Sequence, residues 1–139
     1  MTEWYVRNAR ELDWLENAMG VYCDLLPGVE GEFAINLNVL GNGQPMALYH
    51  HEPHQEGFLV LRGECELRVG DETRRLRAWD YFHCPPDVPH VLVGAGDEPA
   101  LVVAVGSRVG GGEAAYPNDP DPRAAYAAYG KAEQVASPL

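Results

Sequence analysis

The sequence predicts one domain of the all-β class, built as a sandwich or a barrel. Short apolar segments recur between turn signals at nearly regular intervals, which gives eight or more candidate strands, and almost no segment has the spacing of a helix. The chain has 139 residues, enough for a single domain that buries roughly two-thirds of its unfolded surface. A second domain is therefore not expected.

Residues 1–32 are predicted to form an N-terminal arm with one short helix. Asn8 and Glu11 have the spacing of a capping box, and apolar residues follow at helical intervals as far as Met19. We therefore expect a helix near residues 9–18 that covers one end of the fold.

Residues 33–106 are predicted to contain the barrel. The first candidate strand, residues 32–40, alternates as a half-buried strand does. One of its faces is apolar and consists of Phe33, Ile35, Leu37 and Val39. Turn signals bound the further candidate strands, which are residues 57–62, 64–69, 73–77, 80–84, 90–93 and 100–105.

Residues 107–139 are predicted to form a C-terminal tail with one short helix. Asp121 has the character of an N-cap, a proline follows at the first helical position, and Gly130 provides the C-cap. Tyr126 and Tyr129 are three residues apart and share a helix face. We expect this helix to dock on the barrel or on a second subunit.

The composition argues against a nucleic-acid partner. The chain has 21 acidic and 10 basic residues, a formal net charge of -11 and an isoelectric point near 4.7. A surface that binds nucleic acid must replace the counterions of phosphates, and this charge balance does not suit that role.

The sequence also predicts a cytoplasmic protein with no membrane contact. Its first residues carry charges throughout, and no segment approaches the roughly 20 apolar residues needed to span a bilayer. Cys23, Cys65 and Cys84 are odd in number and widely spaced, so we expect reduced thiols rather than disulfides. The latter two are expected in the core.

The densest group of metal-binding side chain types lies between two apolar segments. Seven consecutive residues, beginning at His50, contain three histidines and three glutamates or glutamines. If residues 46–52 are extended, His50 and Glu52 share one face of a sheet, and Pro53 favours a turn that returns Glu56 to them. Burying an uncompensated carboxylate costs several kcal/mol or raises its pKa until it protonates. Either a cation lies among these groups or the site opens to solvent.

Around these residues the chain resembles the cupin superfamily of small metal-binding β-barrels. Glu56, the six residues after it and Gly63 fit the end of the first cupin motif, and residues 85–90, PPDVPH, fit the second. The resemblance covers roughly residues 33–106. In detail, the chain is similar to small single-domain bacterial cupins. It implies a double-stranded β-helix, or jelly-roll, barrel with short N- and C-terminal helical segments.

The resemblance also implies a metal site. Counting back three residues from Glu56 places the two motif histidines at His50 and Glu52, whereas counting back four places them at Tyr49 and His51. We prefer the first register because it keeps one histidine and supplies a carboxylate. Together with the histidine of the second motif, the implied ligands of a divalent transition metal (Fe, Mn, Ni or Zn) are His50, Glu52, Glu56 and His90.

Several points stay open in the sequence. His51 or His54 could take the place of Glu52 as a ligand. The alternative to all four implied ligands is a relic site that binds no metal. Three positions depart from the second cupin motif, in which glycine, glycine and asparagine are replaced by Trp79, Asp87 and Gly94. These changes concern turns more than ligation.

Two classes of function follow. The first is a metal-dependent enzyme acting on a small organic molecule inside the barrel, with oxygenase chemistry preferred and isomerase or epimerase chemistry behind it. Glu52 or Glu56 is the candidate general base if it is not a ligand. The alternative is a non-catalytic small-ligand or metal-binding cupin, or a metal-free isomerase-like enzyme. A homodimer is expected in each case.

Overall fold

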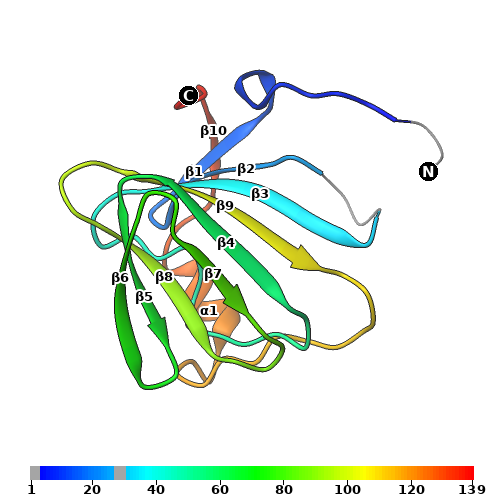
Figure 1. The fold of residues 1–139 in the computed structure, drawn as a ribbon, viewed down its shortest axis with the longest axis vertical. Coiled ribbons are helices and arrows are strands. Elements are labelled where there is room, and N and C mark those ends of the chain that lie inside the picture. Colours follow the sequence, from blue (N-terminus) through cyan, green and yellow to red (C-terminus); the bar gives the residue numbers. More distant parts are fainter. Residues whose placement is uncertain (1–3, 27–30) are drawn as a thin grey trace.

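The computed structural model of the protein describes residues 4–26 and 31–139, which form two packed antiparallel sheets (Figure 1). One sheet has the strand order β10-β1-β2-β3-β9-β4-β7, and the other has the order β6-β5-β8. The predicted double-stranded β-helix barrel is confirmed. The strands are β1 (Trp14–Asn17), β2 (Gly20–Asp24), β3 (Phe33–Leu40), β4 (Glu56–Arg62), β5 (Glu64–Val69), β6 (Glu72–Arg77), β7 (Tyr81–Cys84), β8 (His90–Ala95), β9 (Ala100–Ser107) and β10 (Glu133–Val135).

The main core lies between the two sheets. Val60 of β4, Leu92 of β8 and Val102 of β9 are almost fully buried and belong to one apolar cluster. Cys65 and Cys84 are members of the same cluster, and both are free thiols, as the sequence predicts. This core holds β4 and β8, the two strands whose first residues contribute to the candidate site.

Seven predicted strands of the barrel are present, with ends that differ by at most two residues from the predicted ones. The predicted extended segment at residues 46–52 does not form a regular strand. Between β3 and β4 the chain contacts its neighbours through isolated pairs, which join Pro45 to Val93 and His50 to His90. Pro45 and Pro53 border this segment and cannot donate a backbone hydrogen bond at either end of it.

The predicted helix at residues 9–18 is wrong. Only Ala9–Glu11 form a single 3-10 turn, whose N-cap Asn8 accepts a hydrogen bond from Arg10 N, and the chain then enters β1. The indole of Trp14 is fully buried and donates to Ala9 O at 2.8 Å. Burial of this large side chain and pairing of β1 with two other strands outweigh the local helical spacing.

The two faces of β3 serve different parts of the molecule. On the apolar face, Leu37 packs with Trp14 and Cys23, so the arm covers this face from outside the barrel. On the opposite face, Asn36 and Asn38 line a cavity inside the fold. The barrel interior therefore receives a polar row of side chains from β3.

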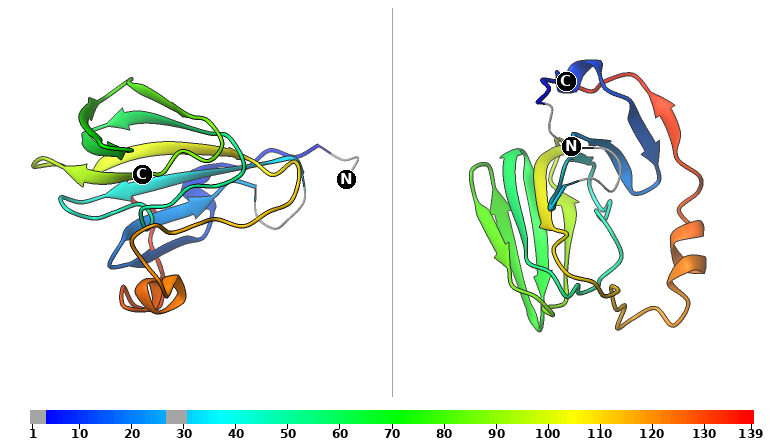
Figure 2. Two further views of the ribbon diagram at one scale, coloured as in Figure 1. Left: turned by 90° about the horizontal axis from the view of Figure 1, so that it is seen from below. Right: turned by 90° about the vertical axis from the view of Figure 1, so that its right-hand side faces the viewer.

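The C-terminal tail is joined to the rest of the fold at several places, from the backbone pair of Ala115 with His51 to a short strand beyond its helix. The predicted helix is present as α1 (Pro122–Ala127), and the Asp121 carboxylate accepts from Ala124 N at 3.1 Å. It ends before Gly130, whose φ of 87° lies in the left-handed region. Beyond α1 the tail runs to β10, which pairs with β1 of the arm (Figure 2). No helix among the described residues is long and apolar enough to cross a membrane.

Among residues 4–26 and 31–139, two non-glycine residues have left-handed backbone conformations, and both stand where the second cupin motif has glycine. Trp79 has φ 74° and Asp87 has φ 64°. The Trp79 side chain is 73 % exposed, so packing compensates little for the strained backbone.

Substitution Trp79→Gly is expected to raise the free energy of unfolding by about 0.5–1 kcal/mol. Relief of the left-handed strain exceeds the extra chain entropy that glycine brings to the unfolded state. Urea denaturation followed by circular dichroism measures the change. The neighbouring Ala78→Gly variant, at a position without a positive φ, should instead lose stability. Equal losses in both variants would contradict the strain argument.

Candidate functional site

Two histidines face each other across an isolated backbone pair. His50 lies in the segment between β3 and β4, and His90 is the first residue of β8. The two residues exchange backbone hydrogen bonds, with N···O distances of 3.2 and 2.9 Å, and their ring centroids are 5.1 Å apart. Both side chains are buried, with His50 8 % and His90 2 % exposed. The pairing fixes both rings on one side of the backbone.

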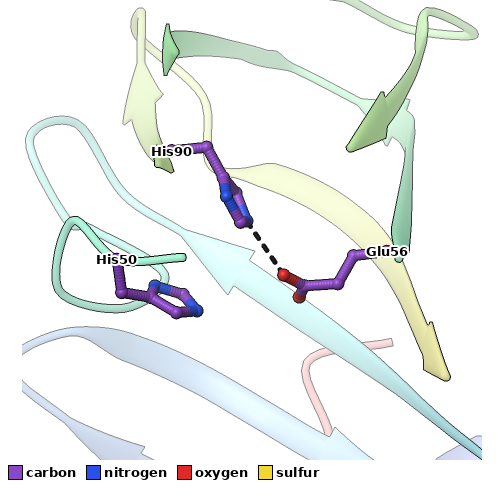
Figure 3. A group of neighbouring side chains, drawn as sticks. All are labelled: His50, Glu56 and His90. Atoms are coloured by element: carbon purple, nitrogen blue, oxygen red, sulfur yellow. Dashed lines mark ion pairs between the residues drawn. The ribbon is translucent and has the colours of Figure 1, made fainter. Parts of the chain in front are cut away.

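Glu56 completes a compact group with these histidines. It is the first residue of β4, and its carboxylate points toward His90 (Figure 3). One ligand atom from each of His50, Glu56 and His90 lies within 4.8 Å of the other two. In the described part of the chain, these residues form the one group of three or more potential metal ligands.

Both rings are oriented in the same way by the main chain. His50 Nδ1 lies 2.7 Å from Leu48 O, and His90 Nδ1 lies 2.9 Å from Val88 O, in each case the carbonyl two residues earlier. Because a carbonyl can only accept, each Nδ1 carries a proton and donates it. The other nitrogen, Nε2, therefore has a free lone pair in the neutral ring, as a metal ligand requires.

The Nε2 atoms face carboxylates. His90 Nε2 is 3.2 Å from Glu56 Oε1, and His50 Nε2 is 3.4 Å from Glu52 Oε1. Burial lowers the pKa of His90, but its contacts with Cys84, Glu56 and the Val88 carbonyl outweigh burial and raise the pKa to about 10.

The same balance operates at His50. Burial lowers its pKa, and the contacts with Glu52 and the Leu48 carbonyl outweigh that effect and raise it. The hydrogen bond from His50 in turn lowers the pKa of Glu52 despite partial burial. The carboxylates therefore attract positive charge to this point, either a proton on each ring or a cation between them.

A divalent cation fits this donor set. Glu56 Oε1 and His90 Nε2 are buried and lack a hydrogen-bond partner of suitable geometry in the described part of the chain, although they are close together. Unpaired buried polar atoms are costly, and coordination would satisfy both. Two imidazoles and one carboxylate are ligands that Fe, Mn, Ni and Zn accept.

The other residues considered as ligands lie outside the three-residue group. Glu52 contacts His50 but is not a member of the three-residue group, and its side chain is 33 % exposed. Tyr49 donates from its hydroxyl to Gly70 O at 3.2 Å, and His51 lies 3.8 Å from the Asp87 carboxylate, away from His50. His54 lines an adjoining hollow. The structure thus brings three of the four predicted ligands together and leaves Glu52 beside them.

The C-terminal tail supports His50, a contribution that the sequence did not reveal. Tyr116 stacks on the imidazole of His50 at 5.8 Å and 27°, and the Tyr126 ring meets Tyr116 edge-on at 5.9 Å. The Tyr126 hydroxyl also accepts from Leu48 N at 3.3 Å, and Leu48 O is the acceptor for His50. The predicted docking of α1 on the barrel is therefore observed, and it restrains the main chain that orients His50.

The site opens into a cavity of about 450 Å³. His50, Glu52, Glu56 and His90 lie in its wall, and β2, β3, Tyr116 and Tyr126 provide much of the remainder. Sequence reasoning missed the inner row of β3, because its polar residues were read as the solvent side of a half-buried strand. The alternation that defines the apolar face could also have identified this row.

The cupin domain family matches residues 37–106, a stretch that contains all four predicted ligands. The chain belongs to the cupin family. No curated protein matches this cupin in sequence.

Solved structures resemble this cupin over most of its length. An RmlC-like cupin from Shewanella frigidimarina is 19 % identical, with a TM-score of 0.65, over 76 % of this chain and 91 % of that one. A sugar phosphate isomerase of the cupin superfamily from Silicibacter pomeroyi is 26 % identical, with a TM-score of 0.65, over 73 % of this chain and 69 % of that one. A polyketide cyclase from Streptomyces resistomycificus is 12 % identical, with a TM-score of 0.72, over 91 % and 94 %. The first and third show the fold alone.

Proposed function

We propose that this cupin binds a divalent transition metal at His50, Glu56 and His90 and acts on a small organic molecule in the adjoining cavity. One observation carries the proposal: Glu56 Oε1 and His90 Nε2 are buried without a hydrogen-bond partner in the described chain and converge with His50. The main-chain contacts at both Nδ1 atoms support it, since they leave each neutral Nε2 available.

The bound metal would supply Lewis acidity or a site for dioxygen. The chain's own residues have other tasks. Glu52 is ionised, lies at the edge of the group and is partly exposed to the cavity, so it is placed to take a proton from a bound substrate. Tyr116 and Tyr126 cover the site and exclude water from one side. Proton transfer by Glu52 suits isomerase chemistry, which is the activity of the Silicibacter pomeroyi neighbour, as well as oxygenase chemistry.

Metal content tests the proposal directly. Tag-free protein, reconstituted anaerobically with Fe(II), Mn(II), Ni(II) or Zn(II), is expected to retain about one ion per chain, because two buried imidazoles and a carboxylate converge there. The variants His50→Ala and His90→Ala should lose it. Elemental analysis after gel filtration measures both.

His83→Ala is the matched control, because His83 is an exposed histidine on β7 outside the group. It should retain the metal. If wild-type protein binds no ion under any of these conditions, or if the His50 and His90 variants bind as much as wild type, the metal site is wrong. Attention then moves to acid-base chemistry by the histidine-carboxylate pairs alone.

A further inference from the structure

The cavity beside the metal group has a polar wall, and the proposed metal site makes no use of it. Tyr22 and Asp24 of β2 lie directly opposite Asn38 and Asn36 of β3 in the register of the sheet, and all four line the cavity. We call these four residues the polar quartet. Asn38 is only 8 % exposed, and its amide donates to the Asn36 carbonyl oxygen, which orders the two amides as one surface.

Turning these polar groups toward the cavity has a cost, which is largest for the buried Asn38, smaller for the half-buried Tyr22 and Asn36, and absent for the exposed Asp24. Amides and hydroxyls lose hydrogen bonds to water when they turn inward, and apolar residues would fill the space at lower cost. Alternation does not force the polarity, since Leu40, two residues further along the same row, is apolar and buried. A bound molecule that exchanges hydrogen bonds with the quartet offsets this cost.

The charges around the cavity select the kind of molecule. Asp24, Glu52 and Glu56 contribute three carboxylates, the imidazoles of His50 and His90 are already paired with Glu52 and Glu56, and none of the described lining residues is lysine or arginine. The undescribed residues 1–3 and 27–30 contain no lysine or arginine in their sequence. Arg108 lines the adjoining hollow. Phosphate recognition in proteins relies on arginine, lysine or a helix N-terminus, so a phosphate ester suits this cavity poorly.

Aromatic rings also line the cavity. Tyr116 and Tyr126 of the tail pack edge-on against each other, and Phe58 comes from β4, in the same sheet as the quartet. Tyrosine offers an apolar ring together with a hydroxyl that both donates and accepts. The cavity thus combines the hydrogen-bonding groups of the quartet, three of them uncharged, with aromatic rings.

We propose that this cavity binds an uncharged molecule bearing several hydroxyl groups, such as a free sugar or sugar alcohol, and discriminates against its phosphate ester. The quartet hydrogen-bonds the hydroxyl groups, the aromatic rings contact the C–H faces, and the carboxylates repel a phosphate. This inference rests on the proposed function in one respect, in that the molecule bound here is the one presented to the metal group.

Nuclear magnetic resonance titration of the metal-free protein tests the inference, since a bound metal would itself attract phosphate. The probes are glucose, xylose and sorbitol, with glucose 6-phosphate, inorganic phosphate and tetramethylammonium for comparison. At least one uncharged polyol should shift the side-chain amide signals of Asn36 and Asn38 and bind about tenfold more tightly than the phosphate ester or the cation. The exposed Asn118 provides an amide outside the cavity that should not shift.

Two variants separate binding from folding. Asn38→Leu and the milder Tyr22→Phe should each weaken polyol binding about tenfold, the worth of one well-made hydrogen bond, while Asn118→Leu leaves it unchanged. Both quartet variants should keep the metal stoichiometry of wild type. If no uncharged polyol shifts the two amides, or if the phosphate ester or cation binds as well, the inference is overturned while the metal-site result stands independently.

Discussion

Replacing Trp14 with alanine is expected to lower the free energy of unfolding by about 3–5 kcal/mol, the usual cost of truncating a buried tryptophan. Trp14 is fully buried at the centre of the second apolar cluster, beside Cys23 and Leu37, and its indole satisfies Ala9 O. The variant leaves a large cavity and removes one of the two hydrogen bonds that Ala9 O accepts. Urea denaturation followed by far-ultraviolet circular dichroism gives the change in stability.

Trp4 supplies the control. It is 88 % exposed, so Trp4→Ala should change the free energy of unfolding by less than about 0.5 kcal/mol. Because β1 lies between β2 and β10, hydrogen exchange in the Trp14→Ala variant should accelerate first in these strands. A variant as stable as wild type would mean that the arm contributes nothing to the cooperative fold.

Adding one methyl group at Gly94 is the second large effect. An alanine Cβ there would overlap Gly41 O and lie 2.7 Å from Leu40 O, both backbone atoms that cannot move aside alone. Gly94→Ala should therefore cost about 3 kcal/mol, at the upper end of overpacking effects. Thermal unfolding measures the loss. The matched control is Gly111→Ala, where no atom lies within 4 Å and the stability should be unchanged.

The same contact connects Gly94 to the metal group. Gly94 N donates to Gln44 O at 2.9 Å, and Gly43 N donates to Gly94 O at 2.8 Å, which pins the segment leading to His50 onto β8. Gly94→Ala should weaken metal binding as well as stability, as seen by calorimetric titration with Mn(II). Unchanged stability and unchanged metal affinity would show that the segment leading to His50 can move away from β8 without weakening the fold or the metal site.

Local patterns were sufficient for the barrel strands and for the helix in the tail. Alternation, turn residues and the proline after Asp121 act over a few residues, and the structure follows them closely. The helix prediction for the segment after Asn8 was wrong because the apolar spacing of this segment is also compatible with a helix. The segment forms a strand because it pairs with residues 133–135, far away in the sequence. Nothing in its own sequence signals that partner.

The residues of the candidate site also differ in whether the sequence could predict their role. His50, Glu56 and His90 could be selected from side-chain chemistry and motif spacing, because the ligand types are distinctive in themselves. Tyr116 carries no such signal, since its stacking on His50 depends on the path of the tail. Asn36 and Asn38 were visible as a row, but whether that row faces solvent or a cavity depends on the arm covering the other face of β3.

Pairing of β10 with β1 has a consequence for how the chain is made. The ribosome releases residues 14–17 long before residues 133–135, so during synthesis β1 has an open edge of unpaired N–H and C=O groups. The fold completes only when the two ends meet, and closing so long a loop is a slow, non-local step. Nascent chains should therefore expose an unpaired strand edge until residues 133–135 have emerged, and truncations that remove these residues should aggregate.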